Sequence, residues 1–364
     1  MRLGIIGLPQ SGKTTIFNAL TRGDRPVGTM AGGGRFEVHT GVVNVPDRRV
    51  DKLSAMFDPR KTIYAQVTYA DIAGVEAGAG RSGFSGPLLN QLTQMDGFLH
   101  VARVFDDPKV PHVAGSVDAA RDVATIDTEF LLNDMLAVER KLERLAQEAK
   151  GGKVKDKALA QHEEALFTKL RDTLAAETPL RDIELTAAEE QLLRGYGLLT
   201  RKPVILVLNI GEKQEDPDAI LKYPHRTSVV VALQGHLEME IAQLSSEDAA
   251  AFLAEYGIAE AGLSRVIRLS YDLLGLESFF TVGEDEVRAW TVRRGAFAPQ
   301  AAGEIHTDME HGFIRAEIVS YDDLIECGGL SQARSKGKLR LEGKEYVVKD
   351  GDILNIRFSP PANR

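Results

Sequence analysis

Cysteine and tryptophan are nearly absent from this chain of 364 residues, which has one of each, Cys327 and Trp290. A single cysteine excludes an intramolecular disulfide framework and a multi-cysteine metal site. No apolar run approaches the roughly 18 residues that a membrane-spanning helix needs. The chain also lacks an excess of positive charge, because 53 acidic and 44 basic residues give a formal net charge of −9. This acidity argues against a protein that clamps nucleic acid over its whole surface, so no DNA partner is expected.

The remaining composition is that of an ordinary globular protein, with 43% hydrophobic and 27% charged residues. A chain of this length exceeds what one hydrophobic core supports, so two or three domains are expected. The first residues, MRLGIIG, lead directly into a strand-like run instead of a basic and apolar leader. We therefore expect no secretory signal, a cytoplasmic location and no membrane partner.

Short apolar, β-branched runs alternate with helix-like stretches through the first three quarters of the chain. This alternation predicts an α/β fold with a mostly parallel sheet. The runs predicted as strands are Arg2–Ile6, Ile63–Ile72, Phe98–Phe105, Val204–Leu208 and Val266–Leu269.

A helical hairpin is predicted between two of these strands, over residues 117–201. Apolar residues from Leu131 to Ala149 repeat at alternating spacings of three and four, which is the pattern of a coiled-coil seam. Gly151 and Gly152 end this helix, and leucines continue on a second one. Lysines at the hairpin tip are interpreted either as a solvated turn or as a contact with an acidic partner.

The last part of the chain, residues 279–364, has the alternating pattern of half-exposed strands and is predicted as a separate small α+β unit. Its predicted strands are Val287–Val292, Phe313–Val319, Lys338–Leu341 and Tyr346–Val348, with one helix at Pro299–Ile305. Residues 1–116 and 202–278 are assigned to the domain with the parallel sheet.

The strongest local motif is GLPQSGKT at residues 7–14, which fits the phosphate-binding pattern GxxxxGK[ST] between a strand and a helix. Backbone N–H groups of such a loop surround phosphate oxygens, and the helix N-terminus adds a positive dipole end. Lys13 would neutralise the β- and γ-phosphates, and the Thr14 hydroxyl would bind Mg²⁺. The predicted nucleotide-binding residues of this segment are Gln10, Ser11, Gly12, Lys13, Thr14 and Thr15.

Two further segments fit a nucleotide site. Asp71-Ile72-Ala73-Gly74 follows a predicted strand, so the Asp71 carboxylate can hold Mg²⁺ through water and the Gly74 N–H can sense the γ-phosphate. After the strand Val204–Leu208 comes Asn209-Ile210-Gly211-Glu212, at the place where related GTPases carry NKxD. Glu212 is one methylene longer than aspartate and should lose the paired hydrogen bonds to guanine, which argues against strict guanine selectivity.

These elements resemble the YchF/Obg-like ATPases, a branch of the P-loop GTPase superfamily, over nearly the whole chain. The resemblance covers GLPQSGKTTIFNAL, DIAG, LLTRKPVILVLN, the NxxE loop and a long segment from Phe279 to Gly329 that is similar to the TGS domain, a β-grasp fold. It implies a Ras-like nucleotide domain with an inserted helical hairpin, preference for ATP, slow hydrolysis and association with the ribosome or its RNA and proteins.

The chain departs from the family at several positions around the phosphates. Gln10 stands where the family usually has asparagine, and Arg35 takes the place of a threonine that completes the Mg²⁺ shell. Arg35 cannot bind a cation but can pair with a phosphate oxygen. Thr29 and Thr40 are alternative sources of the missing hydroxyl.

Catalysis lacks one expected group, because Val75 stands where Ras-like enzymes carry the glutamine that orients water. His112 is the internal candidate, since its loop leaves the carboxyl edge of the sheet and the family has a histidine at the matching position; the alternative is an exposed loop histidine. The preferred hypothesis is a Mg²⁺-dependent ATPase with a low intrinsic rate. A GTPase of the same architecture and a catalytically weak, ribosome- or RNA-associated nucleotide-binding protein are the alternatives.

Overall fold

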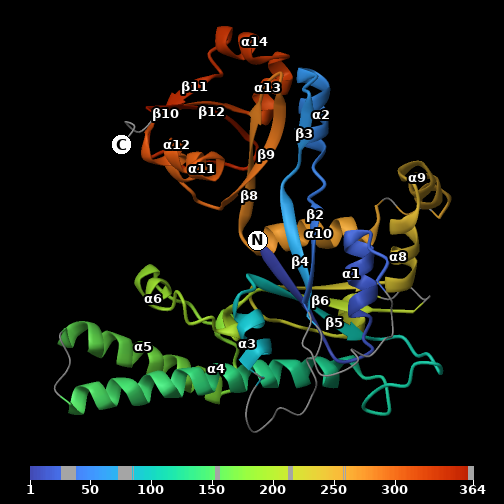
Figure 1. Cartoon of the computed structure of the whole chain (residues 1–364), viewed down its shortest axis with the longest axis vertical. Coiled ribbons are helices and arrows are strands. Elements are labelled where there is room, and N and C mark those ends of the chain that lie inside the picture. The colour runs from blue at the N-terminus through green and yellow to red at the C-terminus, as the bar shows by residue number, and fades with distance from the viewer. Residues whose placement is uncertain are drawn as a thin grey trace. The chain divides into compact units, whose positions relative to one another are not determined.

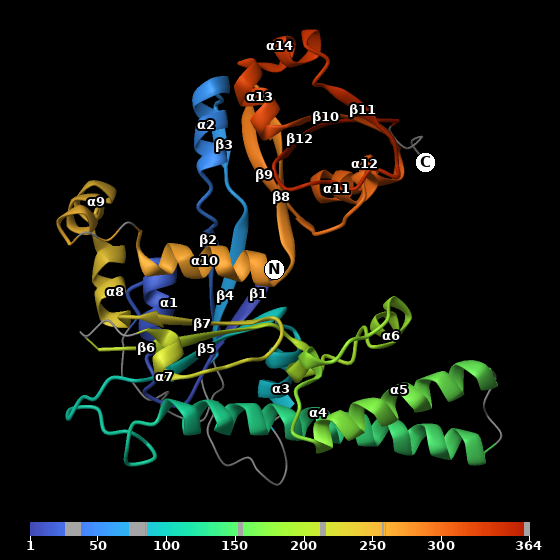
Figure 2. The same cartoon turned by 180° about the vertical axis from the view of Figure 1, so that it is seen from behind.

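The computed structural model describes residues 1–25, 38–72, 84, 86–151, 156–211, 216–256, 258 and 260–359. The chain forms two compact units, which Figures 1 and 2 show from opposite sides. The first comprises Met1–Val42 and Thr68–Val266, and the second comprises Val43–Val67 and Ile267–Arg364. In the described part of the chain, no helix is both long and apolar enough to cross a membrane.

A six-stranded sheet with the order β2-β4-β1-β5-β6-β7 forms the centre of the first unit. β1 pairs in parallel with β4 and β5, β5 with β6, and β6 with β7, so their carboxyl ends meet at one edge. Every residue of β5 and β6 is buried, as expected for the middle of a sheet covered on both faces. The strands are β1 (Arg2–Ile6), β2 (Val38–Asn44), β4 (Gln66–Ile72), β5 (Gly97–Arg103), β6 (Val204–Asn209) and β7 (Ser228–Leu233). The predicted α/β class with a mostly parallel sheet is confirmed.

Helices cover both faces of this sheet. α1 (Lys13–Thr21) and α8 (Gly235–Gln243) lie together on one face, and α3 (Gly86–Thr93) and α4 (Ala119–Lys150) lie on the other (Figure 1). Under α4, the rings of Phe98 and Phe130 are 4.9 Å apart and both side chains are buried. Burial of each such ring stabilises the unit by about 1.5–3 kcal/mol. The other helices of this part are α7 (Pro217–Ile220) and α9 (Ser246–Glu255), and the division between the two units falls within α10 (Gly262–Leu273).

The inserted hairpin is formed by α4 and α5 (Lys157–Ala175), which lie side by side (Figures 1 and 2). Asp118 and Asp156 cap the two helices by accepting hydrogen bonds from backbone N–H groups of the first turn. Val138 packs in the seam with leucines of α5, whereas Leu159 is exposed and lies outside the seam. The predicted hairpin is therefore confirmed. The returning chain contains η1 (Leu180–Asp182), α6 (Ala187–Leu192) and η2 (Leu199–Arg201).

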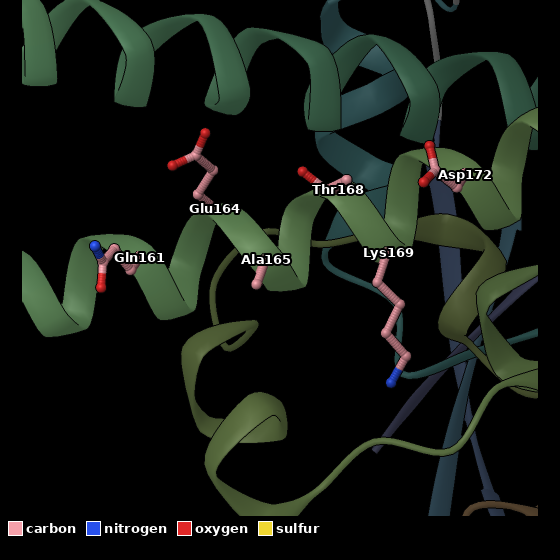
Figure 3. A pocket seen from close by; sticks show the side chains of 6 residues that line it. All are labelled: Gln161, Glu164, Ala165, Thr168, Lys169 and Asp172. Carbon is pink, nitrogen blue, oxygen red and sulfur yellow. The ribbon is translucent and has the colours of Figure 1, made fainter.

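A shallow hollow runs along one side of α5 (Figure 3). The side chains that line it come from this single helix and do not converge on one point; they are Gln161, Glu164, Ala165, Thr168, Lys169 and Asp172. The Lys169 ammonium donates a hydrogen bond to the Glu184 carbonyl oxygen, so it serves the packing of the hairpin. The hollow supplies no set of groups that could hold a ligand.

The second unit is built on a mixed sheet with the order β11-β10-β12-β8-β9-β3, the arrangement expected for a β-grasp unit with one added edge strand. Its strands are β3 (Lys61–Ile63), β8 (Leu276–Val282), β9 (Glu286–Arg293), β10 (Phe313–Ser320), β11 (Arg340–Glu342) and β12 (Asp352–Phe358). Its helices are α2 (Arg48–Phe57), α11 (Ala298–Ile305), α12 (Thr307–His311), α13 (Tyr321–Cys327) and α14 (Leu330–Ser335). Small residues of α11 and rings of the sheet, including Phe279 and Phe313, form the core.

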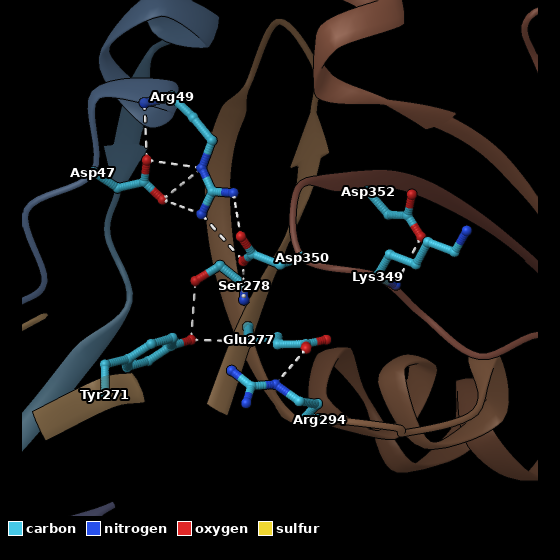
Figure 4. Close-up of polar contacts among 9 residues, drawn as sticks. All are labelled: Asp47, Arg49, Tyr271, Glu277, Ser278, Arg294, Lys349, Asp350 and Asp352. Atoms are coloured by element: carbon cyan, nitrogen blue, oxygen red, sulfur yellow. Dashed lines mark hydrogen bonds and ion pairs between the residues drawn. The ribbon is translucent and has the colours of Figure 1, made fainter. Parts of the chain in front are cut away.

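Residues 43–67 belong to this second unit, although the sequence-based division placed them in the nucleotide domain. The physical reason is that β3 pairs in parallel with β9 along its whole length and extends the sheet. Arg49 of α2 donates hydrogen bonds to both carboxylate oxygens of Asp350 (Figure 4). Its guanidinium also lies over the Phe280 ring. Residues 267–278 also belong to the second unit, although the sequence-based division placed them in the nucleotide domain. The other boundaries of the predicted three-part division stay a prediction.

Two predicted strands are corrected by the structure. Val266–Leu269 lies inside α10, where the buried positions Leu263, Val266, Ile267 and Tyr271 have helical spacing that overrides the β-branched composition. Tyr346–Val348 forms only an isolated bridge to Phe297, and the strand that pairs with both β10 and β8 is instead β12.

Candidate functional site

The loop between β1 and α1 has the backbone that a phosphate-binding loop requires. Gly7 and Gly12 adopt φ angles of 147° and 97°, which favour glycine. A Cβ atom on Gly7 would collide with the Val101 carbonyl oxygen, and one on Gly12 would collide with the Asn209 side chain. α1 then begins at Lys13, so its N-terminus lies at the loop. The loop needs glycine at both positions for space as well as for conformation.

Lys13 spans this loop. Its Nζ donates hydrogen bonds to the carbonyl oxygens of Gly7 at 3.0 Å and Leu8 at 2.8 Å. Burial lowers the pKa of Lys13 to about 8, and the nearby Asp71 carboxylate opposes that shift. A partly buried cation at the N-terminus of a helix is suited to receive an anion such as a phosphate. Ser11 Oγ lies in the same loop, buried, with no hydrogen-bond partner among the described residues.

Thr14 and Asp71 meet at the start of α1 and the end of β4. Thr14 Oγ1 donates a hydrogen bond to Asp71 Oδ2 at 3.1 Å, and Asp71 is 5% exposed. One hydroxyl and one carboxylate are hard oxygen donors, the kind that Mg²⁺ prefers when phosphate and water oxygens complete its shell. Within the described ranges there is no group of three or more His, Cys, Asp or Glu side chains that could hold a metal by itself. The donor set therefore fits a metal that arrives with a nucleotide.

A residue that the sequence did not single out, Arg25, also contacts Asp71. Arg25 Nη1 lies 2.9 Å from Asp71 Oδ2, the oxygen that accepts the Thr14 hydrogen bond. Asn18 of α1 binds the backbone of Arg25 on both sides, donating to its carbonyl oxygen and accepting from its N–H. No sequence motif marks Arg25, because the contact joins residues 46 positions apart.

Asn209 connects the phosphate loop to the segment after β6. Its Nδ2 donates to the Ser11 carbonyl oxygen at 3.0 Å, and its Oδ1 accepts from the Gly235 N–H at 3.1 Å. Ile210 is 8% exposed and packs in a core cluster, so its side chain serves mainly to anchor the segment. Phe105, from the loop after β5, lies beside Gly211.

His112 is held by its own loop and by the first turn of α4. Its Nε2 lies 2.8 Å from Asp122 Oδ2, its Nδ1 accepts a hydrogen bond from the Ala114 N–H, and the two side chains are each 4% exposed. Since Nδ1 accepts, Nε2 carries the proton and donates to Asp122. The structure therefore holds His112 as a buried, hydrogen-bonded side chain, which differs from the solvent-exposed interpretation, and its catalytic role stays a prediction.

The structure brings together Ser11, Gly12, Lys13, Thr14, Asp71 and Asn209, with Gln10 exposed on the loop and Thr15 buried in α1. Thr40 lies in β2 and is exposed. The remaining predicted site residues, Gly74, Val75, Glu212, Arg35 and Thr29, lie outside the described residues.

Two family descriptions match this chain. YchF-GTPase_C, described as a protein of unknown function (DUF933), matches residues 276–359, and MMR_HSR1, described as a 50S ribosome-binding GTPase, matches residues 2–141. Together they span the phosphate loop and the β-grasp unit.

The similarity to known proteins extends over nearly the whole chain. "Ribosome-binding ATPase YchF" of Bacillus subtilis (strain 168) is 41% identical over 368 residues, which is 98% of each chain. "Obg-like ATPase 1" of rice (Oryza sativa subsp. japonica) is 35% identical, covering 99% of this chain and 92% of the relative. Among solved structures, the YchF GTPase of Schizosaccharomyces pombe matches with a TM-score of 0.84 and 32% identity, covering 98% of this chain and 97% of the other.

Proposed function

This chain belongs to the YchF/Obg-like ATPase family, and from that premise we propose that it is a Mg²⁺-dependent ATPase with a low intrinsic rate that acts at the ribosome in the cytoplasm. Its relatives are named ribosome-binding ATPases, and the family description of residues 2–141 names a ribosome-binding GTPase. ATP, Mg²⁺ and a ribosomal surface are therefore the proposed ligand, cofactor and partner.

One observation carries the nucleotide part of the proposal. Lys13, Thr14 and Asp71 lie together at the carboxyl edge of the sheet, where ligands of open α/β sheets bind. Lys13 would neutralise phosphate charge, and Thr14 and Asp71 would hold Mg²⁺. When bound, Mg²⁺ would supply charge stabilisation on the phosphates. The N–H groups of the loop and of Gly74 would orient the γ-phosphate.

Preference for ATP over GTP is supported by the loop after β6. Asn209 binds Ser11 and Gly235, and Ile210 is buried in the core, so the start of this loop is fixed beside the phosphate loop. Glu212 is one methylene longer than aspartate, so its carboxylate would lose the register of the paired hydrogen bonds to guanine. GTP preference is the alternative for this architecture.

The proposed low rate follows from the groups available for water activation. Val75 has no hydrogen-bonding side chain, and His112 is bound to Asp122. His112 would have to leave Asp122 before it could orient water at the phosphates. We propose that His112, once released from Asp122, is the catalytic group that orients water.

The test is a titration of the purified full-length chain with fluorescent ATP and GTP analogues in Mg²⁺, followed by phosphate release from the unlabelled nucleotides. Tighter binding of ATP, slow release, and loss of both in Lys13→Ala are expected. Lys109→Ala, at an exposed position, is the matched control and should behave like the wild type. Failure of the wild type to bind either nucleotide would overturn the proposal.

A second candidate function is a ribosome-associated protein for which the nucleotide is a ligand and not a substrate. The observation that favours it is the engagement of His112 by Asp122, since a retired catalytic histidine would be free to take a structural role. Stoichiometric ATP binding without turnover, measured with ribosomes present and absent, would support this alternative. Turnover that disappears in Lys13→Ala would exclude it.

A further inference from the structure

Asp71 is the one described carboxylate that the proposed metal site uses, and it already has a cationic partner. Arg25 Nη1 lies 2.9 Å from Asp71 Oδ2, and the Asp71 side chain is 7% exposed. The same oxygen accepts the Thr14 hydroxyl hydrogen bond. A divalent cation between Thr14 and Asp71 would need this electron density, so the guanidinium and the metal compete for one carboxylate.

The backbone of Arg25 is held in place independently of this ion pair. Asn18 is 2% exposed and binds the N–H and the carbonyl group of Arg25, at 3.3 and 2.8 Å. The Arg25 guanidinium also lies over the Phe17 ring, 5.9 Å from its centroid. α1, which begins at the phosphate loop, thereby supplies the anchor for Arg25 through two of its residues.

The side chain of Arg25 is less restrained than its backbone. It is 33% exposed, whereas the Asp71 side chain is buried. A guanidinium cannot lose its proton and must remain paired with an anion or return to water. Bound phosphates would place new anionic oxygens beside Lys13 and Thr14, at the N-terminus of α1. Guanidinium groups bind phosphate oxygens well.

We propose that Arg25 is a resident counter-ion of the metal-binding carboxylate, which yields Asp71 to Mg²⁺ when a nucleoside triphosphate binds and pairs instead with its phosphate oxygens. This inference rests on the proposed nucleotide site. It has two opposite consequences. Arg25 raises the Mg²⁺ concentration needed to fill the site, and it supports nucleotide binding when metal is absent.

The experiment compares Arg25→Gln with the wild type in binding of a fluorescent, non-hydrolysable ATP analogue. In EDTA, the variant should bind the analogue at least fivefold more weakly, because a positive charge near the phosphates is lost. With the analogue bound, a Mg²⁺ titration should give a midpoint at least fivefold lower in the variant. Arg22→Gln removes the same charge from an exposed position three residues earlier and should change neither value.

Arg25→Lys keeps the charge and provides a second variant if Arg25→Gln does not fold. Its Mg²⁺ midpoint should be lower than that of the wild type and, where Arg25→Gln also folds, higher than that of Arg25→Gln. A Mg²⁺ midpoint that equals or exceeds the wild-type value in the folded variant would overturn the inference while leaving the proposed function intact. A wild-type chain that binds no nucleotide, with or without Mg²⁺, would overturn both. The two failures are therefore distinguishable.

Discussion

The side-chain nitrogen of Asn209 donates a hydrogen bond to the backbone carbonyl oxygen of Ser11, at 3.0 Å. The oxygen of the same amide accepts from the N–H of Gly235, the first residue of α8, at 3.1 Å. Asn209 is 4% exposed, so both hydrogen bonds are shielded from water. One side chain thus joins the phosphate loop, the end of β6 and the start of α8.

Replacing Asn209 by alanine should weaken both the fold and the site. The change leaves a buried carbonyl and a buried N–H without these partners, at a cost of about 2–4 kcal/mol in the free energy of unfolding. ATP affinity should fall at least tenfold because the phosphate loop loses its support. Urea unfolding and nucleotide titration measure the two effects. Equal stability and affinity in Asn209→Ala would contradict this account of the amide.

Gly12→Ala should be far more damaging than an alanine at another left-handed glycine. The new Cβ would collide with the Asn209 side chain, and its φ of 97° disfavours any residue with a side chain. Gly115, with φ of 80° and open space around its Cβ position, is the matched control. Gly115→Ala should cost only about 1 kcal/mol. Thermal denaturation and ATP binding of the two variants should separate the steric effect from the backbone effect.

Replacing His112 by alanine should distinguish a catalytic role of this side chain from a structural one. If His112 acts in hydrolysis, His112→Ala should reduce ATP turnover at least tenfold, as for loss of a positioned acid–base group, with unchanged ATP affinity. If it serves only to hold its loop through Asp122, turnover should stay constant while limited proteolysis of residues 106–117 becomes faster. Single-turnover phosphate release and protease digestion of the same sample distinguish these results. We expect the first outcome.

Asp134 should make the stability of the first unit depend on pH. Burial raises the pKa of this carboxyl group to about 6 from 3.8, against the opposing effect of hydrogen bonds from Thr200 and Leu199. Because the folded chain binds the proton at higher pH than the unfolded chain does, this contribution to stability is complete below about pH 4 and is lost as the pH rises through 6.

Between pH 5 and pH 7, the free energy of unfolding of the wild type should fall by about 1 kcal/mol because of this group. Asp134→Asn should not show this fall. Asp172→Asn is the control, since that side chain is 63% exposed on α5. Urea unfolding at a series of pH values gives the slopes. The same slope in Asp134→Asn and the wild type would show that another group causes the pH dependence.

Arg49 should stabilise the attachment of residues 43–67 within the second unit. It forms charged hydrogen bonds with Asp47 and Asp350, and Asp350 also accepts from the Ser278 N–H (Figure 4). Arg49→Met keeps side-chain bulk over Phe280 but should reduce stability by about 2 kcal/mol through the loss of partly buried ionic hydrogen bonds. Hydrogen exchange of residues 43–67 should become faster.

The control is Arg60→Gln, which removes another ion pair in the same unit. Arg60 and Asp285 lie 3.3 Å apart with side chains 83% and 87% exposed, so the pair is fully hydrated and should contribute little. Equal exchange rates in Arg49→Met and Arg60→Gln would mean that β3 pairing alone holds the segment.

The sequence predicted some elements well because their signals are local. The seam between Leu131 and Ala149 and the buried runs of β1, β5 and β6 carry their periodicity within a few turns or residues. Val266–Leu269 misled the prediction because β-branched composition indicates a strand while the burial of Leu263 and Tyr271 follows a helix. β12 and β3 were missed because their partners lie far away in the chain.

What the sequence by itself determined is the phosphate loop: its glycines occupy the positions where positive φ and close backbone approach leave no alternative, and the strand and helix beside it are contiguous. The tertiary structure alone decided the pairing of Arg25 with Asp71, the capture of His112 by Asp122 and the transfer of residues 43–67 to the second unit. The reason is physical. A local motif depends on backbone conformation that neighbouring residues dictate, whereas ion pairs and strand pairing depend on which distant segments the folded chain brings within bonding distance.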